Sequence, residues 1–196
     1  MTVLHDKEIQ KLAEFDIFLP FIGEKCRTLD DGTKAISYGL SQAGYDIRLS
    51  QEQFLIFDKS CSNGPLKPLC PKQMPISGHE AVLNHGPLGA WFILPPFSYG
   101  LGVSLELISL PPSVMGIVEG KSTYARCGII INVCPIEPGW SGHLTMHIAN
   151  PTPFPARIYA NEGIAQVVLH QLSDNVNCPY EGNYQGQSAK VQLAAV

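Results

Sequence analysis

The chain has 196 residues, of which 45% are hydrophobic and 15% are charged, so it can enclose a sizeable core as a single domain, residues 1–196. Its formal net charge is −4 and it has no basic run, which excludes nucleic acid binding driven by phosphate contacts. The N-terminus lacks the pattern of a secretory signal, and no apolar run approaches the roughly 20 residues that span a bilayer. We therefore expect a cytoplasmic protein with neither nucleic acid nor membrane as a partner.

One short helix is expected near the N-terminus. Asp6 can serve as its N-cap, and Ile9, Leu12 and Ala13 fall on one apolar stripe. The stretch 37–48 that follows is rich in Gly and Ser and predicts turns.

The rest of the chain predicts strands. Residues 58–89 hold many Pro, Gly, Ser and Asn residues and predict loops with short strands, whereas from Ala90 onward apolar runs alternate with Pro or Gly turns. The candidate strands are 53–57, 90–94, 99–109, 114–119, 128–133, 142–149, 156–160 and 164–171. Many short strands without helices between them favour an all-β barrel or sandwich.

The candidate strand at 142–149 has a period of two. Apolar and polar side chains alternate along it in the order His143, Leu144, Thr145, Met146, His147 and Ile148. This alternation places His147 on the face opposite the apolar one.

The tail and the cysteines carry weaker signals. Residues 173–196 are mostly polar, and we expect them to form a mobile arm. The six cysteines include no C-x-x-C pair and none stands at zinc-ligand spacing from a histidine, so we expect reduced thiols that mostly fill space. Trp140, which follows Pro138 and Gly139, is expected to anchor a turn.

The segment Gly120–Thr123 has the chemistry of an anion-binding turn. It offers backbone N–H groups, the ammonium of Lys121 and two hydroxyls, and Arg126 follows closely. The spacing is not that of a P-loop, so this turn alone is a weak signal.

Five segments carry a family pattern. They are S-Y-G-L-S-Q-A-G-Y-D-I-R at 37–48, L-P-P-F-S-Y-G-L-G at 94–102, G-K-S-T-Y-A-R-C-G-I-I-I-N-V-C-P-I-E-P at 120–138, I-Y-A-N-E-G-I-A-Q at 158–166 and Y-Q-G-Q at 184–187. In these segments the chain resembles the dCTP deaminases of the dUTPase-like β-barrel superfamily. The resemblance implies a distorted β-barrel, a homotrimer with sites at subunit interfaces, and binding of a deoxyribonucleoside triphosphate with Mg²⁺.

The resemblance also assigns roles to individual residues. Ser122, Arg126 and the residue at position 147 would carry catalysis. Glu137 would read the deoxyribose 3′-hydroxyl, and a C-terminal arm would close over the nucleotide as a lid. The residues it assigns to substrate binding are Lys121, Thr123, Val133, Cys134, Glu137, Gln166, Tyr180, Tyr184 and Gln187.

The implied reaction is hydrolytic: water adds to C4 of cytosine and ammonia leaves, converting dCTP to dUTP. Zinc deaminases need an H-x-E motif together with P-C-x-x-C, and this sequence has neither. We therefore expect no catalytic zinc, and side chains that transfer the protons.

The sequence departs from the family at two places. His147 stands where the family has its general acid/base glutamate, and Asn183 stands where the arm has a lysine. Imidazole can accept a proton from water near neutral pH, but a neighbouring Arg126 would lower its pKa. Glu119 is a second candidate carboxylate, and His147 is then structural.

Three functions follow, and the first is our main expectation. In the first, the chain deaminates dCTP. In the second, it hydrolyses a triphosphate as dUTPases and bifunctional deaminase–dUTPases do, since Ala43–Ile47, Glu137 and Gln166 also satisfy the dUTPase pattern. In the third, it is a catalytically silent trimer that binds a nucleotide. The sequence leaves open a C5-modified base and a preference for mono- or diphosphates.

Overall fold

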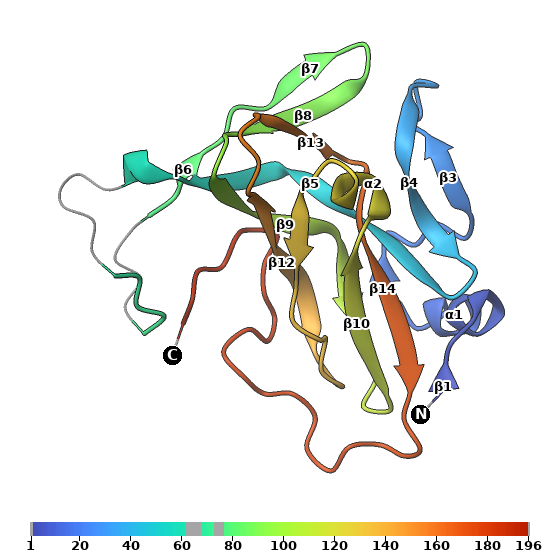
Figure 1. Cartoon of the computed structure of the whole chain (residues 1–196). Helices are drawn as coiled ribbons and strands as arrows, with labels where there is room; N and C mark the ends of the chain where they lie inside the picture. Colours follow the sequence, from blue (N-terminus) through green and yellow to red (C-terminus); the bar gives the residue numbers. More distant parts are fainter. Residues whose placement is uncertain (1, 62–67, 73–76, 196) are drawn as a thin grey trace.

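The computed structural model describes residues 2–61, 68–72 and 77–195. It is almost entirely β (Figure 1). The helices are α1 (Asp6–Ala13), the single turn α2 (Ser122–Ala125) and the 3-10 turn η1 (Lys59–Cys61). The strands are β1 (Thr2–Val3), β2 (Phe18–Leu19), β3 (Lys25–Thr28), β4 (Lys34–Ser41), β5 (Gly44–Phe57), β6 (His79–Glu80), β7 (Asn84–Gly86), β8 (Gly89–Leu94), β9 (Ser98–Ser109), β10 (Val114–Gly120), β11 (Ile130–Asn132), β12 (Ser141–Asn150), β13 (Ala156–Ala160) and β14 (Gly163–Gln171).

One large antiparallel sheet forms the body of the protein. Its path runs β1-β14-β5-β9-β12-β11, with β10 added to β14, and the smaller sheet β13-β8-β7 lies at one end (Figure 1). The large sheet curls until its two edges meet, because Gly116 of β10 and Ile136 after β11 exchange backbone hydrogen bonds of 2.9 and 2.8 Å. The expected all-β class and distorted barrel are therefore confirmed. Among the described residues, no helix is long and apolar enough to cross a membrane.

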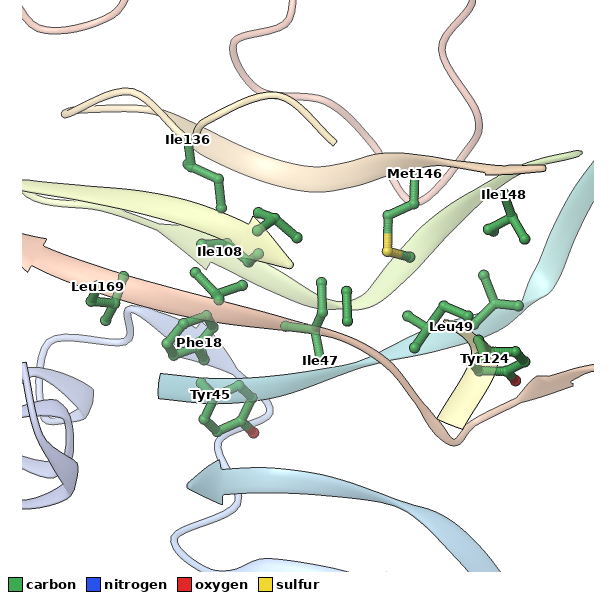
Figure 2. Packing of buried hydrophobic residues seen from close by; sticks show 14 of the residues in the cluster. Phe18, Tyr45, Ile47, Leu49, Ile108, Tyr124, Ile136, Met146, Ile148 and Leu169 are labelled. Carbon is green, nitrogen blue, oxygen red and sulfur yellow. The ribbon is translucent and has the colours of Figure 1, made fainter. Parts of the chain in front are cut away.

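The concave side of the curled sheet holds the core. Alternate residues of β5, β9, β12 and β14 point inward and are fully buried, among them Ile47, Ile108, Met146 and Leu169 (Figure 2). In β12 the intervening Thr145 and His147 are half-buried, as the period of two predicted, but Leu144, predicted on the apolar face, is half-buried as well.

The N-terminal helix begins at the predicted place but has a different cap. Asp6 is its first helical residue and His5 is the N-cap. The reason is local: the backbone N–H groups of Glu8 and Ile9 both donate to the His5 carbonyl, while the His5 N–H donates to the Glu8 carboxylate at 3.1 Å. Ile9 is buried as expected.

The prediction of turns at 37–48 was wrong, because this stretch forms β4 and the start of β5 around a tight hairpin. Its glycines are needed for close backbone contact inside the sheet. At Gly39, with a φ of +89°, a Cβ atom would stand 2.2 Å from the Glu24 carbonyl. Glycine therefore marks crowding here rather than a loop.

The strand predicted at 128–133 is shorter, since α2 and the turn at Gly128 occupy the residues before β11. The other predicted strands from residue 90 onward match to within one or two residues. The stretch 58–89 contains η1, β6 and β7, in agreement with the prediction of loops with short strands. Residues 62–67 and 73–76 within it lie outside the described residues.

The six cysteines are all free, but Cys127, Cys134 and Cys178 are exposed. The expectation that the thiols mostly fill space is therefore wrong for these three residues. They lie in loops around α2, around β11 and in the C-terminal arm, where little chain remains to cover them.

Candidate functional site

A cavity of about 440 Å³ opens between the segment after β11, the first half of β12 and the C-terminal arm. Its wall is mostly apolar, with a few polar groups from each of the three segments, as is usual for a small-molecule site. The lining residues are Val133, Cys134, Pro135, Ile136, Glu137, Trp140, Leu144, Thr145, Tyr180, Tyr184, Gln187 and Gln192.

The first wall is shaped by one buried side chain and one turn. Ile136 is 2% exposed and is fixed by its two bonds to Gly116, so its neighbours Cys134 and Glu137 face solvent. The next four residues turn back, with the Trp140 N–H donating to the Glu137 carbonyl at 3.1 Å. Trp140 is buried, which confirms it as the anchor of this turn.

The second wall is the arm, which the structure shows docked along β12. Gly186 N–H donates to the Ser141 carbonyl at 2.8 Å, and His143 N–H donates to the Gln187 carbonyl at 2.9 Å. The Trp140 indole N–H donates to the Tyr184 carbonyl at 2.8 Å. Figure 1 shows this segment looping beside β12 without forming a helix or strand. Its mobility stays a prediction.

The docked arm carries the three residues predicted for it to the pocket. Gln187 is buried and its amide contacts the Thr145 hydroxyl, while Tyr180 and Tyr184 are partly exposed along the opening. Cys134, expected to pack, instead stands exposed on the pocket wall.

A second group of predicted residues lies on the single-turn helix α2. Tyr124 anchors this turn: it is 4% exposed and its hydroxyl accepts the backbone N–H of Tyr159 at 2.9 Å. Because Tyr124 points inward, Ser122, Thr123 and Arg126 project into solvent. Arg126 donates to the carbonyl of Ser122 at 3.2 Å and forms no ion pair with any described carboxylate.

Lys121 and Gln166 meet at one buried carboxylate. Asp46 of β5 is 1% exposed and accepts from Lys121 Nζ at 2.6 Å and from Gln166 Nε2 at 3.1 Å. Lys121 Nζ also donates to the Ser37 hydroxyl at 2.9 Å. Burial lowers the pKa of Lys121, and the hydrogen bond and charge of Asp46 oppose that shift. Two of the three ammonium donors are thus in use, which leaves one for an anion.

His147 lies just beyond the pocket on the same face of β12 as Thr145, two residues and about 7 Å along the strand. Its partner across the ladder is Asn132, next to the lining residue Val133. The imidazole is half-buried against the Tyr99 ring, 5.2 Å between centroids, and its Nδ1 has no hydrogen-bond partner in the part of the chain that the structure describes.

Burial alone lowers the pKa of His147. The direction agrees with the expectation from the sequence, but Arg126 contributes nothing to the shift within the chain. His147 is therefore a neutral base at physiological pH.

Within one chain the predicted site residues form two groups. Val133, Cys134, Glu137, Tyr180, Tyr184 and Gln187 line the pocket. Lys121, Ser122, Thr123, Arg126, His147 and Gln166 lie outside it. Glu119 is exposed at the end of β10, opposite Gln166 in the ladder.

Sequence reasoning gave no role to Asp46, Ser37 or the pocket residue Thr145. The one signal for Asp46 in the sequence was its place between the apolar residues Tyr45 and Ile47. The structure shows that all three are buried, and a buried carboxylate requires a charged partner. Ser37 and Thr145 carried no such signal, because their partners are distant in sequence.

Replacing Asp46 with alanine leaves the largely buried Lys121 ammonium without a carboxylate. We expect Asp46→Ala to lower the free energy of unfolding by about 3–5 kcal/mol. Lys25→Ala is the matched control, since Lys25 lies 3.5 Å from the same carboxylate but is 32% exposed; its cost should stay below about 1 kcal/mol. Denaturant unfolding at equal protein concentration measures both, and similar losses would contradict the assigned pair.

Because burial lowers the pKa of His147, the unfolded chain binds a proton at higher pH than the folded chain does. The folded state is therefore fully stable with respect to this group above the pKa of His147 in the unfolded chain, about 6.5. It loses stability as the pH falls below that value, because the unfolded chain then gains the proton first. The difference in melting temperature between the parent and His147→Gln should be constant above pH 7.5, and the parent should lose stability relative to the variant as the pH falls toward 5.5. A difference that is flat across this range would show that the imidazole is not desolvated.

Comparison with known proteins agrees with this architecture. A family model described as dCTP deaminase-like matches residues 25–172. A dCTP deaminase of Paraburkholderia xenovorans is 41% identical over 191 residues, covering 95% of this chain and 96% of the relative, and one of Chlamydia pneumoniae is 42% identical over 193 residues with the same coverage. The crystal structure of a 2′-deoxycytidine 5′-triphosphate deaminase from Agrobacterium tumefaciens shares the fold at a TM-score of 0.56 and 17% identity, covering 86% of this chain and 47% of the other. The chain therefore belongs to the dCTP deaminase-like family.

Proposed function

We propose that the chain catalyses the hydrolytic deamination of dCTP to dUTP and ammonia. The observation that supports it most is the pocket of about 440 Å³, whose walls join Val133, Cys134 and Glu137 to the arm residues Tyr184 and Gln187. A nucleoside is of a size that such a cavity accepts. The relatives named dCTP deaminase match this chain over 95% of its length.

In this proposal the pocket takes the nucleoside. The exposed carboxylate of Glu137 accepts the hydrogen bond of the deoxyribose 3′-hydroxyl, and the apolar stretch from Val133 to Ile136 lies along the base. Tyr184 and Gln187 close the opening and exclude water that does not react.

We further propose that a neighbouring subunit supplies the phosphate-binding and orienting groups. Ser122, Thr123 and Arg126 face solvent without carboxylate partners, which suits a surface that meets the pocket of another copy. A homotrimer with a shared site is the assembly that the resemblance implies. The triphosphate would arrive with Mg²⁺ on its own oxygens, since Asp46 is buried and each of its two oxygens already accepts a hydrogen bond, from Lys121 and from Gln166. Such a nucleotide belongs to the cytoplasm, where we place the reaction.

Water addition to C4 needs a group that accepts a proton, and we assign this to His147. Its imidazole is neutral above a lowered pKa, and it borders the pocket beside Thr145. As the hydroxide adds to C4, the proton taken from water is delivered to N3. The proton of the new C4 hydroxyl then passes to the amino group, so that the C4–N bond breaks, ammonia departs and the C4=O of uracil remains. Arg126 of the neighbouring subunit would orient the base and the attacking water.

The direct test is product analysis over dCTP, dCMP, CTP and 5-methyl-dCTP. We expect ammonia and dUTP from dCTP. Release of dUMP and pyrophosphate would instead indicate triphosphate hydrolysis, and unchanged nucleotide would indicate a binding module.

His147→Ala should reduce deamination by about 10²–10⁴-fold, whereas His147→Glu should retain or raise it because it restores a carboxylate.

His143→Ala is the matched control, because the His143 imidazole is half-buried on β12 like that of His147 and lies 3.0 Å from the Ser104 carbonyl, while the backbone bond of His143 to Gln187 is kept in the variant. It should deaminate nearly as fast as the parent. If His147→Ala also does, the histidine is structural and Glu119 becomes the next candidate.

The arm should be required for turnover but not for folding. Truncation after Asp174 removes Tyr180, Tyr184 and Gln187 while leaving every strand of the barrel, so we expect a folded protein that no longer deaminates. Lys190→Ala, an arm variant outside the pocket wall, should behave like the parent. Unchanged kcat and KM in the truncated chain would show that the arm is not a lid.

A further inference from the structure

A cluster of three possible metal ligands lies away from the pocket, where β5 ends. β5 stops at Phe57, and the 3-10 turn η1 folds the chain back so that the Cys61 N–H donates to the Asp58 carbonyl at 3.1 Å. The turn sets Cys61 Sγ 3.5 Å from the carbonyl of Ile56. His79 of β6 is paired directly across from Ile56, so it reaches the same place from the other strand.

The ligand atoms of the three residues converge. Cys61 Sγ lies 3.6 Å from His79 Nδ1, and one ligand atom from each of Asp58, Cys61 and His79 lies within 4.8 Å of the other two. Asp58 and Cys61 are half-buried, whereas His79 is exposed, so one side of the cluster is open to water.

The carboxylate is prepared for binding by its neighbour Ser60. The backbone N–H and the hydroxyl of Ser60 donate to Asp58 Oδ1 at 2.8 and 2.5 Å, which fixes the carboxylate, and no described residue donates to Oδ2. These bonds, with the nearby His79 and Lys59, lower the pKa of Asp58, so it is ionised at neutral pH. Support of this kind for a ligating group is typical of metal sites.

We propose that Asp58, Cys61 and His79 bind one Zn²⁺ ion, with water in the fourth position. Thiolate, imidazole and carboxylate are all zinc ligands, and the soft thiolate favours zinc over Mg²⁺ or Ca²⁺. A thiolate and a carboxylate together neutralise the charge of the ion, and the thiol proton is released on binding.

The ion would connect the two ends of the segment 58–79, because Asp58 and Cys61 lie at its start and His79 lies at its end. The site is also next to Tyr99, whose pKa is raised by burial and then by Cys61. The Tyr99 ring stacks on the Phe57 ring, with 4.7 Å between the ring centroids, and packs against the imidazole of His147, with 5.2 Å between the centroids. The role is structural and does not depend on the proposed reaction.

Zinc titration of the tag-free, metal-stripped full chain tests the proposal. We expect one equivalent of Zn²⁺ to bind and to raise the melting temperature, and Co²⁺ to give a thiolate-to-metal charge-transfer band. Cys61→Ser and His79→Ala should abolish both effects. Cys26→Ser, a half-buried cysteine of β3, and His85→Ala, an exposed histidine of β7, are the matched controls and should bind as the parent does.

A second measurement needs no variant and so does not depend on whether one folds. Zn²⁺ should protect Cys61 of the parent from alkylation, while the exposed Cys127, Cys134 and Cys178 react at unchanged rates. Absence of stoichiometric binding, equal binding by Cys61→Ser, or alkylation of Cys61 unaffected by Zn²⁺ would overturn the site.

Discussion

The buried carboxylate of Asp46 is the interaction on which the rest of the structure depends. It lies in the middle of the curled sheet, 1% exposed, and contacts side chains from three other parts of the barrel: Lys25 of β3, Lys121 after β10 and Gln166 of β14. A carboxylate without these partners could not remain charged in the core. The pairing therefore fixes where β10 ends, and with it the position of α2.

This arrangement has a consequence for anion binding. Asp46 balances only one of its two neighbouring lysines, because Lys121 and Lys25 lie 2.6 and 3.5 Å from the same carboxylate oxygen, and one positive charge is left uncompensated. In the proposed site, an incoming phosphate would meet this charge, the one hydrogen-bond donor left on Lys121 and the exposed guanidinium of Arg126. We infer that phosphate binding in this chain would use Arg126 and the hydroxyls of α2 together with this lysine pair.

Much of the fold could be predicted from the sequence, and the failures have physical causes. The alternation in β12 placed Met146 and Ile148 inside correctly, since a period of two leaves no other choice when one face is buried. The stretch 37–48 failed because its glycines serve close backbone contact, which is decided by chain segments far away in sequence. For the site, the motif order identified six residues that line the pocket. It could not show that the other six predicted site residues lie outside the pocket of the same chain, because the distance between the two groups is set only when the chain folds.

In the proposed assembly, the pocket and the α2 surface form one active site only when two subunits meet. Co-expression of Arg126→Ala with Gln187→Ala tests this claim most directly. Each variant alone removes one half of every site and should be inactive, while mixed oligomers contain interfaces in which an intact α2 meets an intact pocket and arm. We predict that the mixture regains ammonia release from dCTP. A mixture as inactive as either variant, with mixed oligomers shown to form, would contradict a site shared between subunits.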